Sequence, residues 1–580
     1  METEVAANPR LARFERWMPG VHALRTYERS WLSRDLIAGV VLVTLLVPQG
    51  MAYAELAGLP AITGLYTTVI CLLAYALVGP SPILVLGPDS SLGPMIAATI
   101  LPLVGADGDP AKAVVLASAL AIITGLLMIA AGAGHLGFVA DLLSKPTILG
   151  YMNGLALTII VGQLPKLLGF STDADSFLKE IWALLVGIFE GEVVAAAFAI
   201  GLLSLVVILI LGRVLPKIPA VLVAVVLAMA VSVAADLEAR GVSVIGPLPE
   251  GLPSFVFPSI SLPDLGLLVV GALGIALVAL TDTISTATSF ADRQGEEVDG
   301  DREMIGIGAA NVAAGFFQGF PVSTSGSRTA VAEQAGAKTQ LTGLVGAGMI
   351  ALMLVAFPNL LADLPQPTLA AIVIAAAMSL ADVPAVRRLF QQRRTDAWLS
   401  IAAFLAVVFL GVLPGILTAI ALSVVNVFRR VWRPYRTELG AVDGIPGLHD
   451  VTVYPQARVL ERCPVYRFDA PLIFANARTF RDEIHRLAAA EPRPRWIVVA
   501  AEPITDVDTT ACDVLDDLVP ELDRDGTRLV FAELKDPVRA KLKAYGLPDV
   551  LGDERFYPTL GSAVRDYQAQ HPGERGQAEA

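Results

Sequence analysis

Long stretches without a charged residue follow one another through most of the chain. Residues 36–54, 56–78, 113–134, 146–165 and 193–212 are examples, and each is long enough to cross a lipid bilayer as a helix. Hydrophobic residues make up 55% of the 580 residues, whereas charged residues make up only 17%. We therefore expect a polytopic α-helical membrane protein surrounded by the lipid bilayer.

The stretches form two sets of similar size. We count about 14 segments, about seven up to residue 235 and about seven from residue 265. Lys and Arg cluster before the first segment and after every second one, which places both termini in the cytoplasm. Two related sets with an odd number of segments insert with opposite orientation, as in the inverted repeats of secondary transporters. The predicted membrane domain covers residues 35–436, with repeats at about 35–240 and 262–430, after a cytoplasmic segment of residues 1–34.

The composition changes after residue 436. Charged residues then occur throughout, and the strand-like runs RWIVVAAE (495–502) and RLVFAEL (528–534) alternate with helical patterns. These features predict a small cytosolic α/β domain over residues 449–570, followed by a disordered tail at 571–580. The three cysteines of the chain have neither a metal-binding spacing nor a disulfide pattern.

Two membrane segments are interrupted at corresponding places in the two halves. The third segment reads ILVLGPDSSLGPM and the tenth reads FFQGFPVSTSGSRTA. Because proline suits the first turn of a helix, each predicts a strand-like lead followed by a half-helix that begins at Pro88 or Pro321. The two helix N-termini would meet near the middle of the membrane, where their free N–H groups and partial positive charge favour an anion.

Further polar groups surround these breaks. Hydroxyl donors are available from Ser90, Ser91, Ser323, Thr324, Ser325 and Ser327. Arg328 adds a full positive charge. Prolines and serines also occur as simple kinks in membrane helices, but two matching breaks with a buried arginine favour an anion site.

Two acidic residues also lie in the membrane segments. Asp282 and Thr286 are four residues apart, hence on one helical face, and offer oxygens suited to Na⁺ or a carboxylate that could carry a proton. The alternative is that Asp282 is a structural partner for Arg328 or for the backbone. Asp89 would complement a helix N-terminus but repel an anion, so it has no settled role.

At these motifs the chain resembles the SulP family of sulfate permeases. The matching stretches are VPQGMAYAELAGLP (47–60), GLYTTVICLLAYALVG (64–79), GPDSS and FPVSTSGSRTAVAEQAGAKTQ. The resemblance implies fourteen segments in two inverted repeats, split into a core and a gate domain, a cytosolic STAS domain and a homodimer. It also implies that Asp282, with Thr286, is linked to cation coupling. The predicted anion-site residues are Gln49, Tyr53, Asp89, Ser90, Ser323, Thr324, Ser325, Gly326, Ser327 and Arg328.

The resemblance to a STAS domain centres on DVDTTACDVLDDL, residues 506–518. Thr509 corresponds to the residue that is phosphorylated in soluble anti-sigma factor antagonists, which implies a regulatory role. The alternative is that Asp508 or Thr509 simply caps the N-terminus of a helix, and we favour it.

These observations predict a secondary active transporter of a small anion (sulfate, bicarbonate or a dicarboxylate), a symporter driven by Na⁺ or H⁺, in the plasma membrane. The alternatives are an uncoupled anion channel or uniporter, and an anion sensor that signals through a cytosolic partner of its STAS domain. The five histidines are scattered, so the sequence indicates no enzyme and no cofactor beyond the coupling ion. Nothing in the charge pattern indicates a nucleic-acid partner.

Overall fold

The structure is a computed structural model that describes residues 18–105, 108–136, 144–172, 174, 176–215, 218–295, 297–460, 462–547 and 552–572. The contacts divide the chain into two units, Met1–Ser423 and Val424–Ala580. Most of the predicted tail 571–580 and the first half of the predicted N-terminal segment lie outside the described residues.

Every predicted membrane segment of the first half contains a helix. A short helix, α2 (Pro19–Arg25), and a 3-10 turn, η1 (Arg29–Trp31), precede them. The segment helices are α3 (Leu32–Leu56), α4 (Ala61–Val78), α5 (Gly93–Val104), α6 (Pro110–Ala133), α7 (Lys145–Leu168), α9 (Ala195–Val214) and α10 (Ala220–Ala235). An additional helix that the segment count does not include, α8 (Phe177–Glu190), carries exposed apolar side chains such as Trp182 and Phe189.

The second half repeats this order. Its segment helices are α11 (Leu262–Gln294), α12 (Gly300–Phe316), α13 (Gly326–Gln334), α14 (Leu341–Ala356), α15 (Gln366–Leu380), α17 (Arg394–Leu410) and α18 (Val412–Trp432). The 3-10 turn η3 (Pro358–Leu361) and the additional helix α16 (Val383–Gln392) lie between them. The helices α17 and α18 are separated at Gly411, which adopts φ 94°, and Pro414 lies in the first turn of α18. Among the described residues, 8 helices are long and apolar enough to cross a membrane, and α5, α10 and α14 are shorter apolar helices.

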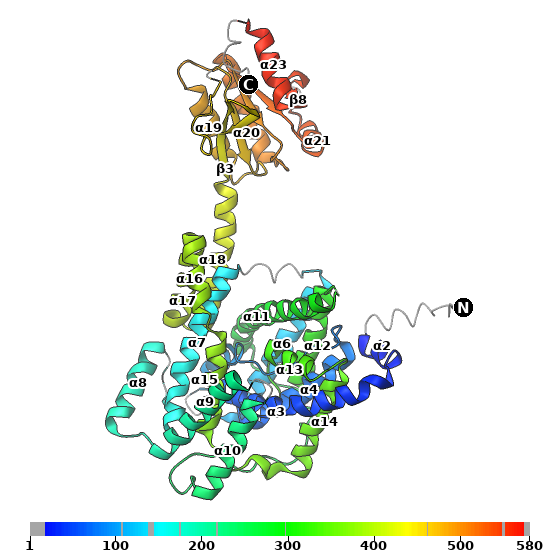
Figure 1. Ribbon diagram of the computed structural model, residues 1–580, viewed down its shortest axis with the longest axis vertical. Coiled ribbons are helices and arrows are strands. Elements are labelled where there is room, and N and C mark those ends of the chain that lie inside the picture. The colour runs from blue at the N-terminus through cyan, green and yellow to red at the C-terminus, as the bar shows by residue number, and fades with distance from the viewer. Residues whose placement is uncertain are drawn as a thin grey trace, which may run out of the picture. The chain divides into compact units, whose positions relative to one another are not determined.

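The packing has the two-fold pattern that an inverted repeat produces. Helix α6 packs against α11 and α12, and α14, its counterpart in the second half, packs against α3 and α4. Likewise α5 packs against α11 and α13 packs against α3. We call these eight helices the core group. Helices α7, α9, α10, α15 and α17 pack mainly on one another and form the gate group, which meets the core group where α3 contacts α10 and α15 (Figure 1).

A buried carboxylate anchors the start of the core group. Asp35, in the first turn of α3, is fully buried and accepts hydrogen bonds from the backbone N–H groups of Lys338 (2.7 Å) and Thr339 (3.2 Å). The hydroxyls of Thr339 (2.7 Å), Thr342 (3.2 Å) and Tyr27 (3.2 Å) also point at it. Asp35 therefore ties α3 to the connection between α13 and α14.

We expect Asp35→Asn to destabilise the protein by about 3 kcal/mol, because an amide cannot accept on both sides and leaves buried donors unpaired. Thermal unfolding of the purified protein in detergent measures the effect. Asp264→Asn, in the first turn of α11, is a matched control because its carboxylate is partly exposed. Equal unfolding temperatures for the two variants would contradict the assigned anchoring role of Asp35.

The second unit is built on a six-stranded sheet of order β4-β3-β5-β6-β7-β8. The strands are β3 (Tyr435–Val442), β4 (Ile445–Asp450), β5 (Val465–Asp469), β6 (Trp496–Ala500), β7 (Arg528–Ala532) and β8 (Phe556–Tyr557). Strands β5 to β8 run parallel, whereas β3 is antiparallel to β4 and β5. The α/β prediction is correct, and the runs at 495–502 and 528–534 form β6 and β7. The sheet starts at Tyr435, earlier than the predicted start at residue 449.

Helices cover both faces of this sheet. They are α19 (Ala477–Ala488), α20 (Thr509–Arg524), α21 (Asp536–Ala544) and α23 (Leu560–Gln570), and a 3-10 turn, η4 (Asp553–Arg555), precedes β8. Apolar side chains of α19, α20 and α21 pack on one face, and those of α23 pack on the other. The sheet therefore has two separate hydrophobic cores, as in other α/β domains.

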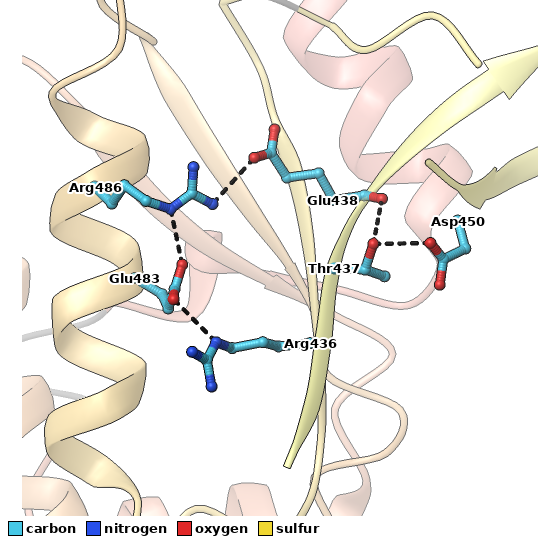
Figure 2. A network of polar contacts seen from close by, with 6 residues as sticks. All are labelled: Arg436, Thr437, Glu438, Asp450, Glu483 and Arg486. Carbon is cyan, nitrogen blue, oxygen red and sulfur yellow. Dashed lines mark hydrogen bonds and ion pairs between the residues drawn. The ribbon is translucent and has the colours of Figure 1, made fainter. Parts of the chain in front are cut away.

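An ion-pair network fastens β3 to α19 (Figure 2). Glu483 of α19 accepts hydrogen bonds from Arg436 (2.9 Å) and Arg486 (2.8 Å), and Arg486 also reaches Glu438 (3.1 Å). Burial raises the pKa of Glu483, but the hydrogen bonds from the two arginines outweigh burial and hold this pKa below its usual value. The stability that Glu483 contributes is thus present above the ordinary pKa of glutamate and is lost as the pH falls through its lowered pKa.

Candidate functional site

The two interrupted segments meet as a short antiparallel pair. Leu86 and Gly87 form β1, and they pair with Thr324 and Ser323 of β2. The strand-like lead is confirmed in the third segment, where β1 precedes Pro88, but it is wrong in the tenth segment, where β2 follows Pro321. The predicted helix starts at Pro88 and Pro321 are also wrong.

The helices begin later, α5 at Gly93 and α13 at Gly326. The physical reason is that the backbone around each proline is used for strand pairing and turns. Pro321 precedes β2, where its missing N–H removes no hydrogen bond from the pair. Pro88 directly follows β1.

Side chains of neighbouring helices hold this crossing in place. Asn311 of α12 accepts from the N–H of Val322 (2.9 Å) and donates to its carbonyl (3.1 Å), as a neighbouring strand would. Thr67 of α4 accepts from the N–H of Phe320 (3.2 Å). These buried amide and hydroxyl groups satisfy backbone that no strand could reach, so the crossing is a rigid frame for a site.

A cavity of about 430 Å³ lies beside this crossing, between the core group and the gate group. Its core-group wall is polar and contains ten of the predicted site residues: Gln49, Tyr53, Asp89, Ser90, Asp282, Thr286, Thr324, Ser325, Gly326 and Ser327. Ser91 and Ser285 belong to the same wall. The gate-group wall is mostly apolar and is formed by Met152, Ile208, Val221, Ile372, Ala375, Ala376, Ser379 and Leu380. One wall can therefore bind polar species, while the other offers them few polar contacts.

Ser323 and Arg328 do not line this cavity. Ser323 is fully buried in β2, and its hydroxyl is 3.4 Å from the carbonyl oxygen of Thr324. Arg328 is also fully buried, and its Nη2 donates to the carbonyl of Pro88 at 2.8 Å. Its Nε and Nη1 have no hydrogen-bond partner among the described residues. The guanidinium thus lies behind β1, and its Nε and Nη1 are still able to donate hydrogen bonds.

Gly87 leaves the room that this guanidinium occupies. A Cβ atom at position 87 would lie 2.6 Å from Nη1 of Arg328. We expect Gly87→Ala to displace Arg328 and to raise the KM for the transported anion roughly tenfold, which corresponds to about 1.4 kcal/mol. Initial rates of uptake into proteoliposomes test this. Gly348→Ala is the matched control, because a Cβ there meets no atom within 4 Å.

The N-terminus of α13 opens directly on the cavity. The Ser325 side chain caps this helix by accepting from the N–H of Arg328, and its hydroxyl is 3.1 Å from that of Ser327. A Cβ atom on Gly326 would lie 3.8 Å from the Thr286 hydroxyl, so α11 faces this helix start closely. Backbone N–H groups and hydroxyls are therefore directed at the part of the cavity beside the start of α13.

The acidic residues lie together on the same wall. Asp89 accepts from the N–H (2.9 Å) and hydroxyl (2.8 Å) of Ser91, and that hydroxyl is also 3.1 Å from the Asp282 carboxylate. One hydroxyl has a single proton, so it cannot donate to both carboxylates at once. Among the described residues, Asp282 forms no ion pair with Arg328, which was one of the two structural roles considered for it.

The fold and the cavity define the class: a multi-pass membrane transporter of small anions. A model of the Sulfate permease family matches residues 32–403, and a model of the STAS domain matches residues 454–563. The chain belongs to the sulfate permease family, as its motifs predicted, and it is a transporter rather than an enzyme.

Relatives agree with this assignment, and solved structures share the fold. The chain is 40% identical over 553 residues to a probable sulfate transporter of Mycobacterium tuberculosis, covering 95% of this chain and 98% of the relative. It is 28% identical to sulfate transporter 1.3 of Arabidopsis thaliana, covering 93% and 85%. The fold resembles that of the murine Solute Carrier 26 member A9 anion transporter in the inward-facing state, with a TM-score of 0.88, 22% identity and coverage of 98% and 96%. The membrane domain of the cyanobacterial bicarbonate transporter BicA gives a TM-score of 0.58 at 23% identity, covering 68% and 98%.

The start of α20 distinguishes the two readings of the STAS motif. Asp508 is the N-cap, and its side chain accepts from the N–H of Ala511 at 2.8 Å. The capping prediction is therefore confirmed for Asp508. Thr509 follows it and is exposed. Its regulatory role stays a prediction.

Proposed function

We propose that this protein is a secondary active transporter that carries sulfate together with a coupling cation through the cavity between the core and gate groups. The observation that supports it most is that the core-group wall contains both groups that favour an anion and groups that favour a cation. The N-terminus of α13 and the partly unpartnered guanidinium of Arg328 favour an anion. Asp89 and Asp282 favour a cation.

The anion would bind at the start of α13. The backbone N–H groups, the hydroxyls of Ser325 and Ser327, and the charge of Arg328 together provide the donors that replace water around an oxyanion. Arg328 would act from behind β1, through the low-dielectric core, unless it moves when the anion arrives. The names of the relatives favour sulfate over bicarbonate and dicarboxylates.

The cation would bind beside Asp282. The two carboxylates within 3.1 Å of the Ser91 hydroxyl would repel a sulfate dianion, and a bound cation offsets that repulsion. The oxygens of Asp282, Thr286 and Ser91 are hard ligands, which favours Na⁺ over H⁺ as the coupling ion. In this reading Asp89 is part of the cation side rather than of the anion side.

The cavity would open toward the cytoplasm. Its gate-group residues lie near the helix ends that the Lys and Arg pattern assigns to the cytoplasm: Val221 at the start of α10 and Leu380 at the end of α15. Movement of the apolar gate wall past the core wall would expose the same site to the other side. We further propose a plasma-membrane homodimer with cytoplasmic termini and a regulatory partner for the STAS domain.

Uptake of labelled sulfate, bicarbonate and succinate into proteoliposomes tests the proposal. The purified protein is compared under an inward Na⁺ gradient, an inward H⁺ gradient and no gradient. Accumulation of sulfate above equilibrium under the Na⁺ gradient alone is the expected result. Uptake that only equilibrates in every condition would overturn active transport and favour a channel or uniporter.

A further inference from the structure

A short basic helix lies between the membrane segments α15 and α17. Helix α16 has 10 residues, which at 1.5 Å per residue span about 15 Å and cannot cross the hydrocarbon core of a bilayer. The backbone is extended at Ala381 before α16 and at Arg393 after it, so α16 continues neither neighbouring helix. Asp382 caps its start by accepting from the N–H of Ala385 at 2.8 Å. Helix α16 is therefore a separate element between two membrane helices.

Helix α16 exposes apolar side chains. It packs against α17 and α7 of the gate group. Val383, Arg387 and Phe390 are spaced four and three residues apart, hence on one face of the helix, and all three are exposed. Trp398 of α17 is 63% exposed, and its ring meets that of Phe390 edge-on with centroids 6.0 Å apart. The exposed face of α16 thus joins apolar groups to a positive charge.

Three arginines of this surface are unpaired. Arg387 and Arg388 of α16 and Arg394 at the start of α17 are exposed, and none of them has an ion-pair or hydrogen-bond partner among the described residues. Arg393 differs, because it forms an ion pair with Asp396 at 3.9 Å. A guanidinium can donate two parallel hydrogen bonds to a phosphate. The three unpaired arginines are therefore available to a phosphate-bearing partner.

The place of α16 in the chain determines which phosphates are near it. It connects two membrane segments, and its arginines belong to a cluster that the positive-inside rule assigns to the cytoplasm. The cytoplasmic leaflet contains anionic headgroups that attract basic segments beside membrane helices. Exposed apolar and aromatic side chains next to the arginines suit the boundary between headgroups and acyl chains. Phospholipid thus matches both the charge and the apolar character of this surface.

Helix α8 offers a comparison within the same molecule. It occupies the corresponding place in the first half, between α7 and α9, and it also exposes apolar side chains, including Trp182 and Phe189. Its sequence contains one Lys and two Glu, whereas that of α16 contains two Arg and no acidic residue. The apolar exposure is thus common to both helices, while the excess positive charge belongs to α16.

We propose that α16, together with Arg394 and Trp398, is a docking surface for anionic phospholipids of the cytoplasmic leaflet. The three unpaired arginines bind headgroup phosphates, and Val383, Phe390 and Trp398 contact the acyl chains. Lipid bound at this surface touches the gate group through α16 and α17. None of the described residues of α16 lines the transport cavity, so this inference is independent of the substrate and of the coupling ion.

The test measures the unfolding temperature of the purified full-length protein in a non-ionic detergent. Phosphatidylglycerol is the anionic lipid, phosphatidylcholine is the reference lipid, and inorganic phosphate represents a free anion. We expect phosphatidylglycerol alone to raise the unfolding temperature of the parent protein. Arg387→Gln, Arg388→Gln and Arg394→Gln combined should require at least tenfold more phosphatidylglycerol for the same rise. Phe390→Ser should cause a smaller loss of the same kind, because it removes an apolar contact but no charge.

The matched control combines Arg478→Gln, Lys543→Gln and Arg565→Gln. These side chains are exposed on helices of the second unit, and their replacement removes the same total charge. The control should respond to phosphatidylglycerol as the parent does.

Several results would overturn the docking surface. Equal responses of the parent to both lipids would exclude a preference for anionic lipid, and an unchanged response of the α16 variant would place the lipid elsewhere. An equal loss in the control would indicate a general effect of net charge. A rise with inorganic phosphate as large as with phosphatidylglycerol would indicate a site for a free anion. A lower unfolding temperature of the α16 variant in phosphatidylcholine alone would mean that the arginines hold another part of the protein.

Discussion

Replacing Asp282 by asparagine is expected to abolish cation-driven accumulation of sulfate while leaving the protein folded. The amide keeps the shape of the side chain and can still interact with the Ser91 hydroxyl at 3.1 Å, but it removes the negative charge that attracts a cation. Transport in the variant should therefore become independent of the gradient and only equilibrate. The expected loss of accumulation under the Na⁺ gradient is complete within error.

Asp292→Asn is the matched control, since Asp292 lies on the same helix but is exposed. Sulfate uptake with and without a Na⁺ gradient, and counterflow of labelled sulfate, measure coupling and translocation separately. Counterflow that persists after coupling is lost would place Asp282 on the cation side alone. Accumulation that still follows the gradient in Asp282→Asn would remove this residue from the coupling mechanism.

The sequence was informative where a charged or polar residue occurs in an apolar segment. A carboxylate in an apolar segment is costly, so Asp282 could be predicted as functional from its position alone. The same argument identified Arg328 and the hydroxyls around it. Proline and serine at matching places in the two halves indicated where the segments break, and the structure pairs these two places as β1 and β2.

What the sequence could not indicate depends on contacts between distant segments. The helix starts moved from Pro88 and Pro321 because β1 and β2 pair with each other, and no local preference encodes that pairing. For the same reason, the position of Arg328 behind Gly87 could not be predicted.

Ser285 and the gate-group wall of the cavity were not predicted from the sequence. Ser285 is one helical turn beyond Asp282, so helical spacing could have placed it on the same face.

The burial of Arg328 determines how much this residue contributes to anion binding. Its guanidinium makes one hydrogen bond, to the carbonyl of Pro88, and its Nε and Nη1 are unpartnered within the described residues. In a protein interior a full charge acts over several ångströms with little screening, so it can stabilise an anion at the start of α13 without lining the cavity. Direct contact and action through the core predict different results for a lysine at this position.

We expect Arg328→Ala to weaken sulfate binding by at least about 30-fold, since removing a buried charge from a charged pair costs roughly 2–5 kcal/mol. Arg328→Lys should restore most of the affinity if charge alone matters, and little if the planar guanidinium must contact the anion. The KM of sulfate uptake and the sulfate-induced rise in unfolding temperature measure both variants. Arg293→Ala is the control and should change neither, because the Arg293 side chain is exposed and forms an ion pair with Glu333. Unchanged affinity in Arg328→Ala would mean that the helix N-terminus and hydroxyls hold the anion without it.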